Sequence, residues 1–394
     1  MTGDRRPRDR FPQRATLRRR AGSLLGARRA GRSDPLVGVV VPAYGVEQWL
    51  PECLASLVGQ QYPHWEAVIV NDGSRDRTGE LAEAWAAKEP RIRVVHTPNR
   101  GLGAARNEGI RHVRGDYLAF VDSDDVLPPR SFGTMVASLE RSGSDFAAGS
   151  ILRWQDDGYS EPRWMRRLHE HPLTGARIEA LPELLGDVFA TDKLFRRSFW
   201  DDAGLAYPEG LRYEDQPTTT QAFLAGSFDV LSDVVYHWRI RTDGTSISQQ
   251  RAAVADLRDR WVTKRLSLDA VRAHSDDRVT EIFIDRVLAG DLWRYFVHLP
   301  DADDEWWRLL REGVLEFWGE RSLVHSGLPP VHRLTGWLVE QDRRTDAAAV
   351  MAYVREMGRP AARVRDELGG RIHVPVLDPE SVDRAALALR AHER

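Results

Sequence analysis

Short apolar runs alternate with longer amphipathic segments between residues 36 and 124. The apolar runs predict strands over residues 37–41, 66–70, 92–96 and 117–121, and the amphipathic segments predict helices over 48–59, 77–88 and 104–113. Apolar strands separated by helices are typical of an α/β fold, a mostly parallel sheet with helices on both faces. Ligands of such sheets bind beyond the carboxyl ends of the strands. We therefore expect the loops that follow the strands to build the site.

The alternation loosens after residue 125. Further strands are predicted over residues 144–152 and 228–238, a helix over 216–225, and a loop bearing Trp and Arg over 158–172. From residue 251 the chain is nearly free of strand patterns, and the segments 252–274, 278–298 and 303–318 predict helices. We expect an N-terminal arm (1–34), an α/β domain (35–250) and a helical C-terminal domain (251–394), whose helices offer a surface for a homo-oligomer.

The composition is that of a soluble globular protein, with 42% hydrophobic and 29% charged residues among 394. No window approaches the roughly 18 to 20 consecutive apolar residues that a membrane-spanning helix needs. The single cysteine, Cys53, lies in a predicted helix and leaves no internal disulfide, which favours a reducing compartment. We therefore expect a cytoplasmic protein.

The net charge of −3 is unevenly distributed, since residues 1–34 carry eleven Arg and three Asp, or +8, and the remainder carries −11. The arm has no apolar core of signal-peptide length. One interpretation is a disordered basic tail, and the other is adhesion to an anionic membrane surface with Leu17, Leu24 and Leu25 entering the lipid. The second would place the protein peripherally at the inner face of the cell membrane. Nucleic acid is not an expected partner, because the acidic remainder offers no second basic surface.

Asp122-Ser123-Asp124-Asp125 directly follows the predicted strand 117–121. Residues i and i+2 of an extended segment point the same way, so we expect Asp122 and Asp124 to face one space beyond the sheet. Crowded carboxylates need cations, and Mg²⁺ or Mn²⁺ takes oxygen ligands while keeping open positions for substrate phosphates. The cluster predicts a divalent metal site that serves phosphate-ester chemistry.

Two polar loops follow earlier strands. Asn71-Asp72-Gly73-Ser74 suits either a simple turn or an Asp72 carboxylate that accepts a hydrogen bond from a ligand N–H, such as that of a base. Residues 99–107 open a predicted helix with glycines, where backbone N–H groups and the helix dipole favour an anion. Arg106 stands where a dinucleotide fingerprint has its third glycine, and it is either a charge-assisted donor to a diphosphate or a solvent-facing arginine.

Two later motifs also carry polar side chains. Glu214 and Asp215 suit the first turn of the predicted helix, and beside a metal–phosphate site a carboxylate there would take the proton of an acceptor hydroxyl. His237 is either a metal ligand or a structural histidine at a strand end. Downstream, Arg239, Arg241 and Ser246 either close over a diphosphate as a flap or belong to a surface loop.

Together these motifs resemble those of family 2 glycosyltransferases of the GT-A fold in order and spacing. The residues that carry the resemblance are Val39-Val40-Val41-Pro42-Ala43-Tyr44, Asn71-Asp72-Gly73-Ser74, residues 99–107, Asp122-Ser123-Asp124-Asp125 and Glu214-Asp215. The resemblance covers about residues 36–250. It implies transfer of a sugar from a nucleotide diphosphate with inversion at the anomeric carbon.

The resemblance also implies a role for each motif. Asp124 would hold Mn²⁺ or Mg²⁺ directly, Asp122 would approach the ribose or a metal-bound water, and His237 is a candidate third ligand. Asp215 would be the base, with Glu214 orienting it or touching the acceptor. The expected nucleotide-sugar-binding set is Pro42, Ala43, Tyr44, Glu47, Asp72, Gly73, Arg100, Arg106, Asp122, Ser123, Arg239, Arg241 and Ser246.

We thus expect a metal-dependent inverting transferase of hexosyl or N-acetylhexosaminyl type that builds a bacterial cell-surface polysaccharide, teichoic-acid-like polymer or glycolipid. The donor would be a nucleotide-diphosphate sugar, with UDP favoured, and the acceptor a carbohydrate, polyol-phosphate or lipid-linked molecule. The alternative is a catalytically silent nucleotide-sugar-binding module for assembly. Nucleotidyl transfer is not expected, because residues 42–46 lack a glycine-rich triphosphate loop with a lysine.

Overall fold

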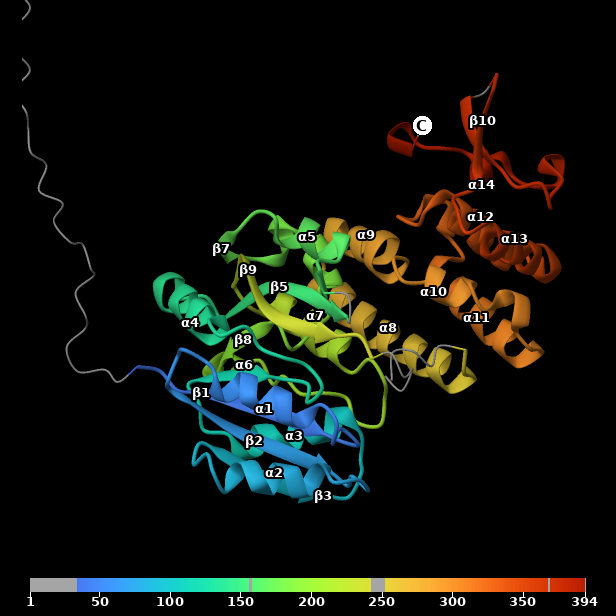
Figure 1. The fold of residues 1–394 in the computed structure, drawn as a ribbon. Coiled ribbons are helices and arrows are strands. Elements are labelled where there is room, and N and C mark those ends of the chain that lie inside the picture. The colour runs from blue at the N-terminus through green and yellow to red at the C-terminus, as the bar shows by residue number, and fades with distance from the viewer. Residues whose placement is uncertain (1–33, 156–157, 242–251, 368, 394) are drawn as a thin grey trace, which may run out of the picture. The chain divides into compact units, whose positions relative to one another are not determined.

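A nine-stranded sheet runs through the structure in the order β3-β2-β1-β4-β8-β5-β9-β7, with β6 paired to β5 (Figure 1). The computed structural model describes residues 34–155, 158–241, 252–367 and 369–393. The strands of the sheet are β1 (Val37–Ala43), β2 (Trp65–Asp72), β3 (Ile92–Thr97), β4 (Tyr117–Phe120), β5 (Phe146–Gln155), β6 (Gly158–Ser160), β7 (Leu173–Ala176), β8 (Lys193–Arg196) and β9 (Phe228–Arg239).

The sheet is mostly parallel, which confirms the expected fold class. Strand β1 pairs parallel with β2 and β4, β2 pairs parallel with β3, and β5 pairs parallel with β9. The short β8 lies antiparallel between β4 and β5, and β7 is antiparallel to β9. The carboxyl ends of β1, β2, β4 and β9 therefore meet at one edge of the sheet, as the sequence predicted for the site.

Helices cover both faces because the side chains of β1 alternate between two cores. Val39 and Val41 pack in one hydrophobic cluster with Leu54, whereas Val40 packs in the other cluster with Ile110. The helices of this half of the chain are α1 (Leu50–Val58), α2 (Thr78–Ala86), α3 (Leu102–His112), α4 (Ser131–Ser142), α5 (Arg163–His169), α6 (Arg197–Asp202) and α7 (Asp215–Ala225). Each predicted helix in the first third of the chain is present within a few residues of its expected bounds.

The described residues from 252 onward are mainly helical, with one β-hairpin as the exception. The helices are α8 (Val254–His274), α9 (Asp277–Ile282), a π-helix (Phe283–Leu288), α10 (Trp293–Phe296), α11 (Asp304–Trp318), α12 (Pro330–Glu340), α13 (Arg344–Met357) and α14 (Arg384–Leu387). The exception is an antiparallel hairpin of β10 (Ala362–Asp366) and β11 (Gly369–His373), which the sequence did not predict. The predicted helix over 278–298 is broken into α9, the π-helix and α10.

The prediction of a loop over residues 158–172 is wrong. The first part is strand β6, which pairs with β5, and the later part is helix α5. A three-residue strand and a seven-residue helix are too short for their periodicity to be read from sequence. The stacked rings of Trp154 and Tyr159, with centroids 5.8 Å apart, fix the hairpin across the pair.

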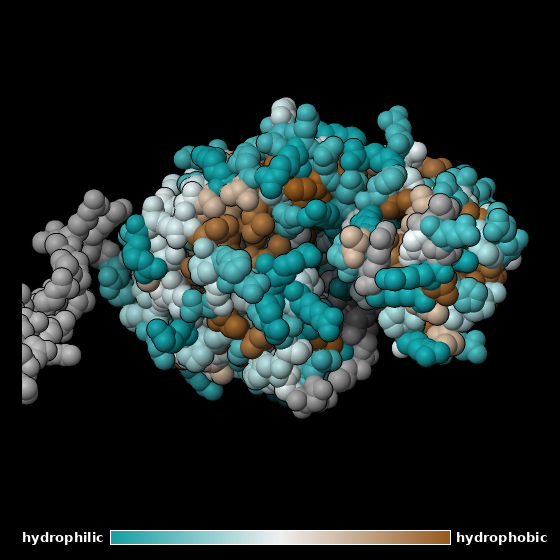
Figure 2. All heavy atoms as spheres, turned by 90° about the horizontal axis from the view of Figure 1, so that it is seen from above, coloured by the Kyte–Doolittle hydropathy of each residue, from teal (hydrophilic) through white to brown (hydrophobic). Residues whose placement is uncertain are grey.

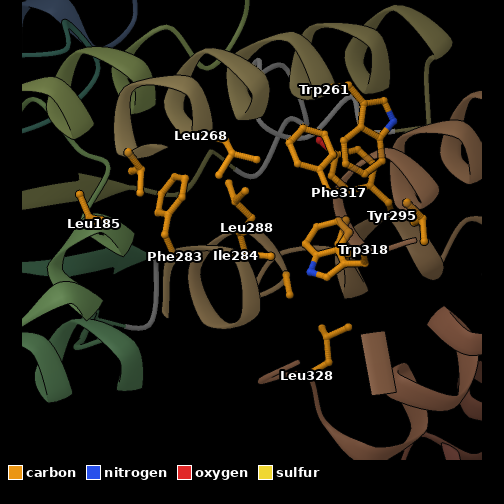
Figure 3. Packing of buried hydrophobic residues seen from close by; sticks show 14 of the residues in the cluster. Leu185, Trp261, Leu268, Phe283, Ile284, Leu288, Tyr295, Phe317, Trp318 and Leu328 are labelled. Carbon is orange, nitrogen blue, oxygen red and sulfur yellow. The ribbon is translucent and has the colours of Figure 1, made fainter. Parts of the chain in front are cut away.

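The C-terminal helices pack on one another around large aromatic side chains (Figure 3). Trp261 of α8 stacks on Phe317 of α11 with ring centroids 5.5 Å apart, and its indole N–H donates to the Leu309 carbonyl at 3.1 Å. Gly313 permits the contact, since a Cβ there would lie 2.1 Å from the Trp261 ring. Both aromatic residues are buried in the core of the C-terminal helices.

Residues Pro35–Arg394 form one compact unit, so the boundary at residue 250 remains a prediction. In the view of Figure 2 the surface is mostly hydrophilic, with hydrophobic residues in small patches. None of the helices in the described part of the chain combines the length and the apolar character that crossing a membrane requires.

Candidate active site

Asp122-Ser123-Asp124-Asp125 forms a turn directly after β4. The Asp125 N–H donates to the Asp122 carbonyl at 3.0 Å, so the segment is not a continuation of the strand. The prediction that Asp122 and Asp124 share one side of an extended segment is therefore wrong, although the two carboxylates still interact electrostatically. Ser123 is buried within the turn.

Arg106 joins this turn to the start of α7. Its guanidinium donates to Asp122 Oδ1 at 2.8 Å and to Glu214 Oε1 at 2.5 Å, and its side chain is 2% exposed. The interpretation of Arg106 as a solvent-facing residue is therefore wrong. Burial lowers the pKa of the guanidinium, but Asp122 and Glu214 raise it above its ordinary value, so the group is charged. The ring of Tyr207 lies 5.1 Å from the guanidinium carbon.

Two arginines hold Asp124: Arg239 is the last residue of β9, and Arg241 follows it. Arg241 Nε donates to Asp124 Oδ2, and Arg239 Nε donates to the Asp124 carbonyl, both at 2.7 Å. Each guanidinium lies 4.0 Å from a tryptophan ring, Arg239 over Trp154 and Arg241 over Trp49. Burial raises the pKa of the Asp124 carboxyl, Arg241 opposes that rise, and Asp122 adds to it.

Asp125 is a buried acceptor that ties the turn to β9, which sequence reasoning missed. The Tyr236 hydroxyl donates to Asp125 Oδ2 at 2.8 Å and the Arg239 N–H to Asp125 Oδ1 at 2.7 Å. Burial and the neighbouring carboxylates of Asp124 and Asp122 raise its pKa well above the ordinary value. The third carboxylate of the motif therefore positions the flanking strand.

Asp72 ends β2 and holds the loop that opens α3. Its carboxylate accepts the N–H groups of Arg100 and Gly101, both at 2.9 Å, and the Thr97 hydroxyl at 3.2 Å. Gly73 has a φ of +72°, and a Cβ there would lie 2.7 Å from the backbone nitrogen of Asn99. Asp72 is therefore more than a simple turn residue, because it fixes the glycine-bearing loop at the sheet edge.

The remaining predicted residues of the first half lie around the end of β1. Pro42 and Ala43 are buried in the strand, and Tyr44 follows them with 52% of its surface exposed. Glu47 accepts the Arg77 N–H at 2.8 Å just before α2. Separately, the exposed Arg100 forms an ion pair with Glu209 at 2.5 Å. Ser246 lies outside the described residues.

Glu214 and Asp215 stand at the N-terminus of α7. Burial raises the pKa of the Glu214 carboxyl to about 7, against the lowering effect of Arg106. Burial also raises the pKa of Asp215, although Arg106 lowers it. Glu214 is engaged by Arg106, whereas no side chain in the described part of the chain donates a hydrogen bond to the Asp215 carboxylate.

The carboxylates after β4 suit a hard divalent cation. Asp122 and Asp124 each use one oxygen in an arginine contact and keep the other, and their mutual repulsion is relieved by positive charge. His237 is half-buried with its ring 4.5 Å from that of Tyr159, and burial lowers the pKa of the imidazole, which keeps it neutral as a ligand must be. Among the described residues, Asp122, Asp124 and His237 do not form a preassembled set of three ligands.

A second cluster of candidate metal ligands is already neutralised. His169, Asp187 and Asp192 have ligand atoms within 4.8 Å of one another. The ammonium of Lys193 lies 2.9 Å from carboxylate oxygens of both Asp187 and Asp192, in a fully buried environment. The Lys193 ammonium provides the positive charge that these carboxylates need, so we assign the cluster a structural role instead of metal binding.

Comparisons with known proteins identify a family and relatives to which this chain is similar. Residues 38–203 match the family model for glycosyl transferase family 2. The uncharacterized glycosyltransferase EpsJ of Bacillus subtilis (strain 168) is 34% identical over 218 residues, which are 52% of this chain and 61% of EpsJ. The putative glycosyltransferase EpsH of the same organism is 33% identical over 210 residues, again 52% of this chain and 61% of EpsH. The chain thus spans less than two thirds of these curated relatives.

Another relative is also represented among the similar solved structures. The poly(ribitol-phosphate) beta-N-acetylglucosaminyltransferase TarS of Staphylococcus aureus (strain Mu50 / ATCC 700699) is 27% identical over 66% of this chain and 44% of TarS. The crystal structure of S. aureus TarS 1-349 with UDP-GlcNAc matches with a TM-score of 0.65 at 21% identity, covering 86% of this chain and 96% of that chain. This likeness shows that the fold is of the GT-A type with a helical C-terminal region.

Proposed function

Because residues 38–203 belong to glycosyltransferase family 2, we propose that this protein moves a sugar from a nucleotide-diphosphate sugar to an acceptor hydroxyl, with inversion at the anomeric carbon. The observation that carries the proposal is the position of Arg106, which contacts Asp122 at 2.8 Å and Glu214 at 2.5 Å. The buried Arg106 guanidinium thereby holds Asp122, which would face the diphosphate, close to Glu214, which would face the acceptor.

The nucleoside would bind at the ends of β1 and β2. The exposed ring of Tyr44 offers a stacking face for the base, and the Asp72 carboxylate has lone pairs left for a base N–H. Pro42, Ala43, Glu47, Gly73, Arg100 and Ser123 complete the proposed pocket. Within it, Gly73 and the backbone of Arg100 act through the loop geometry that Asp72 maintains.

The diphosphate would lie over the turn after β4. We propose that Asp124 holds Mn²⁺ or Mg²⁺, with Asp122 beside it and His237 as the candidate third protein ligand. Such an ion stabilises the negative charge that builds on the leaving diphosphate. Arg239, Arg241 and, from outside the described residues, Ser246 would add donors to the phosphate oxygens, and the tryptophan contacts keep both guanidinium groups at this edge.

Asp215 would take the proton from the acceptor hydroxyl. Inversion requires the acceptor oxygen to enter opposite the leaving diphosphate, and a base across the sugar from Asp124 meets that requirement. The raised pKa of Asp215 brings its basicity closer to the working pH than that of an ordinary aspartate. Glu214, fixed by Arg106, would orient the base or contact the acceptor.

TarS supports a narrower proposal on substrates. Its crystal structures contain UDP-GlcNAc and UDP, and its name describes a poly(ribitol-phosphate) acceptor. We therefore favour a UDP-sugar donor of hexosyl or N-acetylhexosaminyl type. The acceptor would be a carbohydrate, polyol-phosphate or lipid-linked molecule of the bacterial cell envelope.

The donor half of the proposal is tested by nucleotide affinity with and without Mn²⁺. Asp124→Ala should lose more than about 10-fold of the Mn²⁺-dependent affinity for UDP, because a metal ligand contributes several kcal/mol. The matched control is Asp233→Ala, which removes the same charge from an exposed position of β9. Unchanged Mn²⁺ dependence in Asp124→Ala would contradict the metal role.

The basic arm supports a proposal on location. We propose that residues 1–34, with a charge of +8, hold the protein at an anionic membrane surface from the cytoplasmic side. Flotation with vesicles of phosphatidylglycerol should recover full-length protein and leave protein without residues 1–34 in solution, and added salt should reduce recovery. Equal partitioning of both proteins would end this idea.

A further inference from the structure

The turn that carries Glu214 and Asp215 is held by buried side chains of the C-terminal helices. Tyr213, directly before Glu214, has a φ of +62°. A bulky residue in the left-handed region costs about 1–2 kcal/mol and persists only where its surroundings enforce it. The contacts of Tyr213 and of its neighbours identify what enforces this conformation.

Asp256 of α8 receives three donors around this turn. The Tyr213 hydroxyl lies 3.0 Å from both carboxylate oxygens of Asp256, Arg212 donates to Oδ1 at 3.2 Å, and the Tyr295 hydroxyl donates to Oδ2 at 3.2 Å. Asp256 has no exposed surface. A single buried carboxylate therefore anchors the two residues that precede Glu214.

Arg260, one turn later on α8, contacts the turn from both sides. Its guanidinium carbon lies 4.8 Å from the Tyr213 ring, and its Nη1 donates to Gln216 Oε1 at 2.7 Å. Asp291 fixes the guanidinium by accepting from Arg260 Nε at 2.8 Å, and it also accepts from the Lys264 ammonium at 2.7 Å. The residue before Glu214 and the residue after Asp215 are thus both held by Arg260.

The placement of these groups on α8 is regular. Asp256, Arg260 and Lys264 recur every four residues, so they share one face of the helix, and that face packs against α7. Packing alone would be served at least as well by apolar side chains, because buried charges cost desolvation energy. The polar face of α8 contacts the residues on either side of Glu214 and Asp215. Accurate positioning of these two carboxylates would explain why the face is polar.

We propose that Asp256 and Arg260 are positioning residues for Asp215, acting through Tyr213 and Gln216, so that the helical region after residue 251 completes the transferase site. This inference rests on the proposed function. It gives the C-terminal helices a role that the motifs of residues 36–250 do not suggest. Trp261, on the same helix, anchors α8 to α11 by its stack on Phe317, so the support is itself rigid (Figure 3).

The test compares full-length wild type with Tyr213→Phe, Asp256→Asn and the double variant. Tyr213→Phe keeps the ring on Arg260 and removes only the hydroxyl that contacts Asp256. We expect the turnover number to fall by about 10- to 100-fold in each single variant, as for a small misplacement of a reacting group. The donor KM and the UDP affinity should stay within about twofold of wild type, because the donor loops are not touched.

The double variant and a control separate positioning from general stability. Because the two groups act through one contact, the double variant should lose no more turnover than the worse single variant. The control is Arg265→Gln, also on α8, which breaks an exposed ion pair with Glu316 of α11 and should leave turnover unchanged. Thermal unfolding of Tyr213→Phe reports whether its fold is intact, and this variant alone suffices if Asp256→Asn does not fold.

The possible results are distinguishable. If the wild type turns over the donor and Tyr213→Phe does so at the same rate, the inference is overturned while the proposed function stands. A loss of turnover that is matched by a loss of UDP affinity also overturns it, because the change would then be a general structural one. A wild type that binds but turns over no donor overturns the proposed function and the inference together.

Discussion

The loops proposed to bind the donor (the donor-side loops) and the turn proposed to carry the base (the base-bearing turn) are built in different ways. At the donor side, Asp72 is met by backbone N–H groups of Arg100 and Gly101, and the loops follow directly from strands of one parallel sheet. At the base, Glu214 and its neighbours are held by side chains of Arg106, Asp256 and Arg260, which are far away in the sequence. Loops that follow strands can be located from a sequence pattern, whereas a turn held by remote side chains cannot.

The largest difference between the two regions should appear on replacing Asp215, the proposed base. Asp215→Asn keeps the size of the side chain and removes its basicity, so we expect transfer to fall by about 10²- to 10⁴-fold. UDP affinity should be retained, because the donor loops do not depend on Asp215. Steady-state kinetics beside calorimetric UDP titration measure the two quantities. Full activity in this variant would remove Asp215 from the mechanism.

The next prediction concerns the buried cluster of His169, Asp187, Asp192 and Lys193, where we expect the stability of the fold to depend on an ionised carboxylate. Asp187 is ionised, since Lys193 and His169 outweigh burial and lower its pKa to about 2, whereas burial and Asp187 raise the pKa of Asp192 to about 8. Asp187→Asn should lower the free energy of unfolding at pH 7 by about 3 kcal/mol, the low end for a broken buried pair, because Asp192 can then ionise in its place.

Asp192→Asn is the matched control, and we expect it to keep or raise the free energy of unfolding at pH 7. The dependence on pH follows from the signs. The stability that Asp187 contributes is present above the ordinary aspartate pKa and is lost as pH falls towards 2, whereas that of Asp192 is present at low pH and is lost as pH rises through 8. Urea unfolding across pH would show this, and equal losses in both variants would contradict the assignment.

The smallest effect concerns the pH dependence of transfer. Because the pKa of Glu214 is raised to about 7 and that of Asp215 is also raised, the turnover number should fall as pH falls through the neutral range. Glu214→Gln removes one of two coupled negative charges, so the acid limb should move to lower pH, by up to about one unit. An acid limb near pH 4 in the wild type would contradict the raised values.

The parts of the structure that sequence predicted are those with strong local periodicity. The predicted strand 37–41 lies within β1, Val37–Ala43, and the predicted helix 104–113 nearly coincides with α3, Leu102–His112. Motifs at the ends of those strands could therefore be placed at one edge of the sheet. The elements that were not predicted include β6, α5 and the strands of the β10–β11 hairpin, which are three to seven residues long and too short for their periodicity to be recognised.

For the candidate site, the sequence proposed residues but not their contacts. Asp122, Asp124, Glu214 and Asp215 were proposed from their motifs, whereas the turn at 122–125 and the buried contacts of Arg106 could be seen only in the fold. Asp125 could have been suspected from the strand pattern that brings Tyr236 beside the turn. The four-residue spacing of Asp256, Arg260 and Lys264 is a sequence signal for the support of the proposed base, since charged side chains on the buried face of a helix need partners.

We propose above all that this protein breaks the bond between a sugar and a nucleotide diphosphate. The decisive experiment incubates the full-length protein with a panel of nucleotide sugars and Mn²⁺ and measures the release of nucleotide diphosphate, which requires no knowledge of the acceptor. We expect release from one donor, with a UDP-sugar favoured, and loss of that release on chelation of the metal or in Asp215→Asn. Binding of a nucleotide sugar without release from any donor would contradict it and would indicate a silent binding module instead.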